Sequence, residues 1–271
     1  TKDRDILIHS NTANKTVESM HTYYDTLFDY DHTHTLKSLK ESEPLIDTMM
    51  PCLKTYTATD ASSATMHWIE AEKILVDNAT FVHSPLNRMH KDPVLLKTFS
   101  AIGEKSEALF IQSPYIIFSK QMLEYFPDYE TKDLTVLTNN IDLSTNYFAM
   151  SGYVRYKDSI NAHARLYEYQ GDTTIHAKTL TFDENISVIG SFNLDPRSAT
   201  LSTESAIVIV SETFKSELDS VIDTYMTKSL EVNDEGGYID NPEVHPTPIN
   251  DTKRFKIRLR SFITRFFDPM L

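Results

Sequence analysis

The chain has 271 residues, of which 40% are hydrophobic, 24% charged and 11% aromatic. This composition is typical of a globular protein with a buried core and excludes a largely disordered chain. The formal net charge of −13 argues against a protein whose whole surface binds nucleic acid. The single cysteine, Cys52, excludes an internal disulfide and a cysteine-rich zinc site, and no apolar run is long enough for a membrane-spanning helix.

The first third of the chain predicts few regular elements. A short apolar run predicts a strand at residues 5–9, and apolar residues at helical spacing predict a helix over 20–28. Residues 41–66 are rich in Ser, Thr and Pro, which indicates a connection. A further strand is expected at 69–76.

Helices and strands alternate from residue 92 onward. Helices are expected at 94–102, with Asp92 as the N-cap, and at 120–125, 146–160 and 214–225. The expected strands are 108–112, 134–137, 166–169, 175–182, 187–191 and 206–210. This alternation indicates an α/β domain with a largely parallel or mixed sheet.

The end of the chain differs in charge. Residues 231–251 are acidic and contain Gly and Pro, which predicts a loop, whereas the final 19 residues hold six of the 26 basic residues. An apolar helical face is formed by Phe255, Leu259, Phe262, Ile263 and Phe266. Such a helix suits the headgroup region of an anionic bilayer. The alternative is a terminal helix that docks on its own domain and leaves its basic face in solvent.

One segment has the residues of a catalytic site, in the pattern His-x-Lys-x4-Asp-x6-Gly-Ser-x-Asn, which begins at His176. Residues two apart on a strand face the same side, so His176 and Lys178 are expected to point together. His176 then acts as a nucleophile or a proton donor. Lys178 supplies fixed positive charge to the phosphate oxygens of a phosphodiester, which gain negative charge in the transition state.

The remaining residues of the pattern support these two. Ser191 and Asn193 are expected to donate hydrogen bonds to the same phosphate oxygens. Glu204, eleven residues beyond Asn193, is the expected carboxylate that orients the imidazole of His176, and Asp183 is counted with the catalytic residues. We expect no metal and no other cofactor, because Lys178 and the neutral donors supply the electrostatics.

Chance explains part of the pattern but not the whole. A His-x-Lys pair is expected at roughly even odds in a chain with ten histidines, and an isolated histidine is usually structural. The complete pattern has a chance frequency of roughly one in a million from average residue usage. It also coincides with an expected strand, turn and strand.

These residues resemble the phospholipase D superfamily, and in particular its bacterial cardiolipin synthase-like branch. The likeness is strongest from Gly190 to Ser198 and from Leu201 to Glu204, and it covers roughly residues 92–225. Shorter matches follow the family's order upstream, namely Ser113-Pro114-Tyr115, Leu137-Thr138-Asn139, Gly152-Tyr153-Val154-Arg155-Tyr156 and Leu166-Tyr167-Glu168. The resemblance implies an α/β/α sandwich with a mixed central sheet.

The resemblance also implies a two-step exchange through a phosphohistidine. One histidine attacks the phosphorus, and the histidine of a second motif protonates the leaving alcohol and later activates the incoming one. By likeness to two-motif members, His176 is the acid/base, and the nucleophile role is the alternative. The implied substrate is a phospholipid such as phosphatidylglycerol, with cardiolipin synthesis by a peripheral enzyme on the cytoplasmic face of the membrane as the leading activity.

The chain departs from the family because it has no second His-x-Lys copy. Residues 1–28 resemble the segment that follows the first motif, so we expect either a chain that lacks its N-terminal half or a homodimer that completes the site. The expected division is 1–45, a remnant of the first half; 46–91, a connection; 92–235, the C-terminal catalytic half; and 236–271, a loop and basic tail.

Three other functions are compatible with the sequence. A hydrolytic phospholipase D differs only in using water as the acceptor. A nuclease of the same superfamily is disfavoured by the net charge of −13 and by the lack of a basic groove with interleaved aromatic residues. We therefore expect no nucleic-acid partner. A non-catalytic interaction module is disfavoured by the intact motif.

Overall fold

A computed structural model describes residues 2–4, 6–8, 14–30, 73–86, 91–125, 132–144, 146–248 and 250–264. The chain divides into two compact units, one made of Thr1–Glu18 with Val76–Leu271 and the other of Ser19–Leu75. The helix α1 (Lys15–Phe28) confirms the helix expected at 20–28. Most of the expected connection at 46–91 lies outside the described residues.

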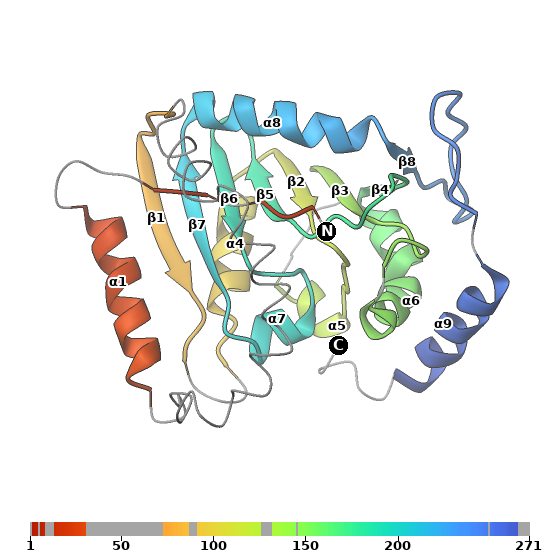
Figure 1. Cartoon of the computed structure of the whole chain (residues 1–271), viewed down its shortest axis with the longest axis horizontal. Helices are drawn as coiled ribbons and strands as arrows, with labels where there is room; N and C mark the ends of the chain where they lie inside the picture. Colours follow the sequence, from red (N-terminus) through yellow and green to blue (C-terminus); the bar gives the residue numbers. More distant parts are fainter. Residues whose placement is uncertain are drawn as a thin grey trace, which may run out of the picture. The chain divides into compact units, whose positions relative to one another are not determined.

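The first unit is built on a mixed sheet (Figure 1). Its described strands are β1 (Asn78–His83), β2 (Ala108–Gln112), β3 (Asp133–Asn139), β4 (Arg165–Tyr169), β5 (Lys178–Phe182), β6 (Ile186–Gly190), β7 (Ser205–Val210) and β8 (Ser229–Glu231). They lie in the order β1-β7-β6-β5-β2-β3-β4-β8. The strands β2, β3 and β4 are parallel, and the other neighbours are antiparallel.

Helices cover both faces of this sheet. On one face, α4 (Val94–Glu104) and α6 (Tyr147–His163) pack in the main core with side chains such as Ile111 of β2 and Leu180 of β5. On the other face, α8 (Glu212–Met226) packs against Ile189 of β6 (Figure 1). Successive residues of a strand point to opposite faces. Because helices cover both faces, a central strand is apolar on both. The expected α/β/α sandwich with a mixed sheet is confirmed.

Three further helices belong to the described part of the unit, two of them short. They are α5 (Lys120–Leu123), α7 (Pro196–Thr200) and α9 (Asp251–Thr264). Serine and asparagine side chains cap several helices, with Ser119 before α5, Asn146 before α6 and Ser211 before α8. No described helix combines the length and apolar character needed to cross a bilayer.

Several expected boundaries are wrong. The motif strand begins at Lys178 rather than at residue 175, because the chain before it pairs with the N-terminal segment at Lys2. Asp92 does not cap α4: its carboxylate accepts a hydrogen bond from Lys97 Nζ at 2.5 Å instead. Residues 73–76 are not in a strand, since β1 begins at Asn78, and residues 69–72 lie outside the described part. Residues 6–8 of the strand expected at 5–9 form no strand.

Candidate active site

His176 is joined to a carboxylate from the start of the chain. Its Nδ1 lies 2.6 Å from Asp3 Oδ1. The His176 side chain is 49% exposed and that of Asp3 51% exposed, so a substrate can reach the imidazole. The orienting carboxylate is therefore Asp3, and the expectation that Glu204 holds this imidazole is corrected.

Backbone pairing brings Asp3 to this position. The motif histidine and Thr174 before it both pair with the Lys2 backbone: Lys2 N donates to Thr174 O and His176 N donates to Lys2 O, both at 2.8 Å. The Lys2 ammonium also donates to Tyr169 Oη at 2.9 Å. Figure 1 shows the first described residues running beside β5. The N-terminal segment is thus fixed beside the motif.

Arg4 anchors the N-terminal segment to the sheet on the other side of Asp3 in the sequence. Its guanidinium donates to Gln112 Oε1 at 3.0 Å and also to Thr179 Oγ1. Burial lowers the pKa of Arg4, and Tyr225 partly opposes this. Because Lys2 and Arg4 are both anchored to the sheet, the Asp3 carboxylate between them has a defined direction toward His176.

Lys178 lies buried beneath the histidine. It is 8% exposed, and its Nζ donates to the backbone oxygen of His176 at 2.5 Å. Burial lowers its pKa from 10.5 to about 8, although the carboxylates of Asp3, Glu204 and Asp195 act in the opposite direction. The structure therefore places a largely buried cation two residues from His176, where the carboxylates of Asp3, Glu204 and Asp195 favour its charged form.

Glu204 is a second carboxylate that interacts electrostatically with this lysine. Its carboxylate accepts hydrogen bonds from Ser191 Oγ at 2.5 Å and from Ser198 Oγ at 3.1 Å. Burial raises its pKa, while the two serines and then Lys178 lower it. Glu204 thus belongs to the same cluster as Lys178, but its hydrogen bonds go to serines rather than to His176.

Asn193 is next to this second carboxylate. Its Nδ2 reaches Ser198 Oγ only at 3.4 Å, a long hydrogen bond. Its Oδ1 is buried and has no hydrogen-bond partner among the described residues. The Nδ2 hydrogens, held only by this long bond, remain available to a phosphate oxygen, as the sequence predicts for Asn193. The Ser191 hydroxyl instead donates to Glu204, so its expected hydrogen bond to the phosphate is not formed in this arrangement.

Asp195 is a site residue that the sequence prediction missed. Its carboxylate caps α7 by accepting a hydrogen bond from Ser198 N at 2.6 Å. It is 3% exposed, and burial raises its pKa to about 7 against the effect of the Ser198 hydrogen bonds. The order Asp195-Pro196 is a recognisable helix start, because Asp is a good N-cap and Pro suits the first helical position.

Asp183 does not join the cluster. It follows β5 at the end opposite to Lys178, about 16 Å along the strand at roughly 3.3 Å per residue. Its φ of 46° is in the left-handed region, and its Oδ1 accepts hydrogen bonds from Glu107 N at 2.9 Å and Ala108 N at 3.0 Å. The expected catalytic role is corrected to a structural one, because this carboxylate ties the β5-β6 turn to the start of β2.

Gly190 has a steric role in the motif. It ends β6 opposite Ala206 of β7, and a Cβ at this position would overlap the backbone of Ser205 and Ala206. Only glycine allows the two strands to approach this closely. The glycine thus brings Ser191 and Glu204, which follow and precede these strand ends, within hydrogen-bonding distance.

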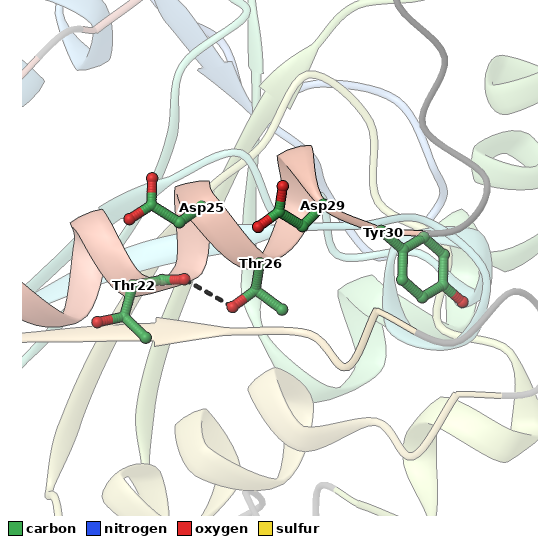
Figure 2. A pocket seen from close by; sticks show the side chains of 5 residues that line it. All are labelled: Thr22, Asp25, Thr26, Asp29 and Tyr30. Atoms are coloured by element: carbon green, nitrogen blue, oxygen red, sulfur yellow. Dashed lines mark hydrogen bonds between the residues drawn. The ribbon is translucent and has the colours of Figure 1, made fainter.

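An open hollow in the other unit contains none of the motif residues. Figure 2 shows it along α1, lined by Thr22, Asp25, Thr26, Asp29 and Tyr30, with Thr26 Oγ1 donating to Thr22 O at 2.7 Å. It offers no histidine, lysine or arginine for a phosphate. No described cluster of three or more His, Cys, Asp or Glu side chains could hold a metal ion.

Comparisons with known proteins show the family of this part of the chain. Residues 99–226 match the family model described as cardiolipin synthase, phospholipase D-like domain. This segment therefore belongs to the phospholipase D superfamily, in its cardiolipin synthase-like branch, and the resemblance seen in the sequence is confirmed.

Individual relatives match about half of the chain. An uncharacterised protein of Helicobacter pylori strain 26695 is 29% identical over 156 residues, which are 52% of this chain and 30% of that protein. Cardiolipin synthase C of Escherichia coli is 28% identical over 143 residues, 45% of this chain and 30% of the enzyme. A Clostridium perfringens cardiolipin synthase is 31% identical over 124 residues, 45% of this chain and 25% of that enzyme. The matches thus span less than a third of each relative.

A solved structure supports the fold. Phosphatidylserine synthase of Haemophilus influenzae aligns with 71% of this chain and 48% of its own, with a TM-score of 0.53 and 13% identity. At this identity the likeness concerns the fold alone.

Proposed function

We propose that the protein exchanges phosphodiester bonds of phospholipids through a phosphohistidine intermediate, and that cardiolipin synthesis is its activity. The observation that supports this most strongly is the cluster in which Asp3 holds His176 and the buried Lys178 interacts electrostatically with both Asp3 and Glu204. The family match of residues 99–226 supports the same reaction.

The hydrogen bond to Asp3 defines which imidazole nitrogen reacts. A carboxylate that accepts the Nδ1 proton leaves Nε2 with its lone pair free, and this nitrogen is the one that attacks phosphorus or exchanges a proton with an alcohol. His176 serves as the acid/base in this proposal, with the nucleophile role as the alternative. Asp3 also stabilises the imidazolium that forms after proton transfer.

The other side chains act on the phosphate. In the transition state negative charge spreads over the non-bridging oxygens, and the Lys178 ammonium stabilises it at short range in a partly desolvated site. Asn193 donates to the same oxygens through its amide N–H, while the Ser191 hydroxyl stays with Glu204. Because Lys178 and this amide supply the electrostatic stabilisation, the proposed reaction uses no metal.

A second histidine completes the proposed cycle, because one group bonds covalently to phosphorus while another moves the proton. The chain has no second His-x-Lys pair. We propose that the partner group comes from a further segment of the protein or from a second copy of it, and that Glu204 orients it as Asp3 orients His176. Ser191 and Ser198 would then hold Glu204 in place for the partner.

The proposed site of action is a membrane surface, because both the donor and the acceptor are membrane lipids. The cytoplasmic face is proposed because one cysteine in 271 residues agrees with a reducing compartment. Water in place of the acceptor alcohol would make the enzyme a hydrolytic phospholipase D, and this alternative differs only in the product.

The test is product analysis with labelled phosphatidylglycerol, using the complete protein. We expect labelled cardiolipin and free glycerol, unchanged by EDTA, and their loss in His176→Gln. The matched control is His163→Gln, since His163 lies at the exposed end of α6 with its Nδ1 on Ser159 O at 2.7 Å. Phosphatidic acid as the only lipid product would show that the enzyme hydrolyses the donor instead of transferring it to an acceptor lipid. Full activity of His176→Gln would refute the proposal.

A further inference from the structure

The C-terminal helix docks on its domain by an unexpected side. α9 packs against α6 (Figure 1), and its buried apolar residue is Ile257, which is 1% exposed. On the same side, Lys253 donates to Asp142 O and the Arg260 guanidinium lies 5.0 Å from the Tyr147 ring centre. From α6, Arg155 donates to Ser261 O at 2.5 Å. This side of α9 is therefore largely polar.

The opposite side of α9 is apolar and exposed. Phe255 is 67% exposed, Leu259 51% and Phe262 65%. At about 100° per residue these three positions lie within one stripe, and Ile257 lies roughly opposite to it. The sequence predicted this apolar face; of its remaining members, the side chain of Ile263 and all of Phe266 lie outside the described parts. An amphipathic helix normally buries such a stripe against its own domain, but here the domain binds the other side.

Basic residues border the exposed stripe. Lys256 and Arg258 are both exposed and lie on its two flanks. The final 19 residues hold six of the 26 basic residues in a chain whose net charge is −13. A face that is apolar in the middle and cationic at its edges is complementary to an anionic lipid surface, where large apolar side chains enter the acyl boundary and the cations meet the headgroups.

We propose that the stripe formed by Phe255, Leu259 and Phe262, with Lys256 and Arg258, docks the protein on an anionic bilayer. The inference rests on the proposed lipid reaction for its purpose, but the binding itself needs no turnover. The contact of α9 with α6 holds the stripe outward, so the membrane is reached without unfolding of the helix from the domain.

Vesicle sedimentation tests this inference with the complete protein. We expect binding to phosphatidylcholine vesicles that contain phosphatidylglycerol, weaker binding without it, and a loss of roughly tenfold or more when Phe255, Leu259 and Phe262 are all replaced by serine. Added salt should weaken the binding through Lys256 and Arg258. The matched control replaces Val221 and Ile239, exposed at 45% and 51% on other elements, by serine and should bind like the unaltered protein.

The outcomes separate the docking inference from the proposed reaction. Equal vesicle binding by the stripe variant and the control would overturn the inference, as would an unaltered protein that binds neither vesicle. If the stripe instead holds two copies of the chain together, the unaltered protein would be a dimer and the stripe variant a monomer, with equal vesicle binding. This result would also overturn the docking inference. Turnover of a dispersed short-chain phospholipid is measured in parallel, so docking without turnover would refute only the reaction, and turnover without docking only the inference.

Discussion

The two carboxylates around Lys178 occupy contrasting surroundings. Asp3 is half exposed and bonds to His176, whereas Glu204 is buried and bonds to Ser191 and Ser198. Each is followed three residues later by an apolar run, Ile6-Leu7-Ile8 in one case and Ile207-Val208-Ile209 in the other. Glu204, the carboxylate nearer in sequence, therefore does not orient the motif histidine, whereas Asp3, 173 positions away, does.

Removal of the Lys178 cation should have the largest effect on turnover. We expect Lys178→Met to lower turnover by roughly 10³-fold or more, because the transition-state charge loses its main stabilising group. The folded chain, in contrast, should gain stability. Folding lowers the pKa of Lys178 from 10.5 to about 8, so at pH 7 the charged lysine destabilises the folded state by up to about 3 kcal/mol.

Denaturant unfolding at several pH values checks the stability effect. Between pH 8 and 10.5 the folded chain has released a proton that the unfolded chain still holds, so the free energy of unfolding should rise with pH in the unaltered protein. This rise should be absent in Lys178→Met. A variant that is both inactive and less stable at pH 7 would contradict the description of Lys178 as a buried functional charge.

The variant Asp3→Asn tests directly whether Asp3, rather than Glu204, orients His176. Loss of the acceptor on Nδ1 should misorient His176 and lower turnover by roughly 10²-fold, with little change in stability, because Asp3 is half exposed. Asp92→Asn is the matched control, since Asp92 is a 58% exposed carboxylate with a surface partner, Lys97. Equal activity of the two variants would remove Asp3 from the site.

Gly190→Ala tests the packing on the Glu204 side. The added Cβ would overlap the backbone of Ser205 and Ala206, so β6 and β7 must separate, at about 1–3 kcal/mol of folding free energy. Thermal unfolding measures the loss. Gly237→Ala is the control, because a Cβ there meets only the Asn233 side chain at 3.3 Å; equal destabilisation of the two variants would speak against tight strand contact at the motif.

Asp195→Asn should give the smallest effect, a change in how the folding stability depends on pH. The pKa of Asp195 rises to about 7 on burial, so between pH 4 and 7 the folded chain holds a proton that the unfolded chain has lost, and stability falls as pH rises. Asparagine keeps the cap on α7 and should reduce this slope. An unchanged slope would show that Asp195 does not titrate in this range.

Long, periodic elements could be predicted from the sequence. The helix α8 agrees with expectation because its apolar residues recur at helical spacing. The strand β2 and the helix α6 also lie where they were expected. The helix α7, with five residues, and the strand β8, with three, are too short to show an apolar period. These elements depend on tertiary contacts, such as the pairing of β8 with β4.

The site was predictable only in part. His176, Lys178, Ser191, Asn193 and Glu204 do gather at one end of β5 and β6, as the spacing predicts. The structural role of Asp183 and the orienting role of Asp3 could not be derived from spacing, because both depend on backbone partners far away in the chain. The shared order of a carboxylate and an apolar run at Asp3 and Glu204 is a signal that could have indicated Asp3.

Whether Asp3 and His176 act as one catalytic unit is best tested by the turnover of Asp3→Asn, His176→Gln and the double variant under identical conditions. Residues that act as a unit are not additive, so we expect the double variant to be no slower than His176→Gln alone. A double variant slowed by the product of the two single effects would contradict this expectation, because Asp3 would then act independently of the imidazole.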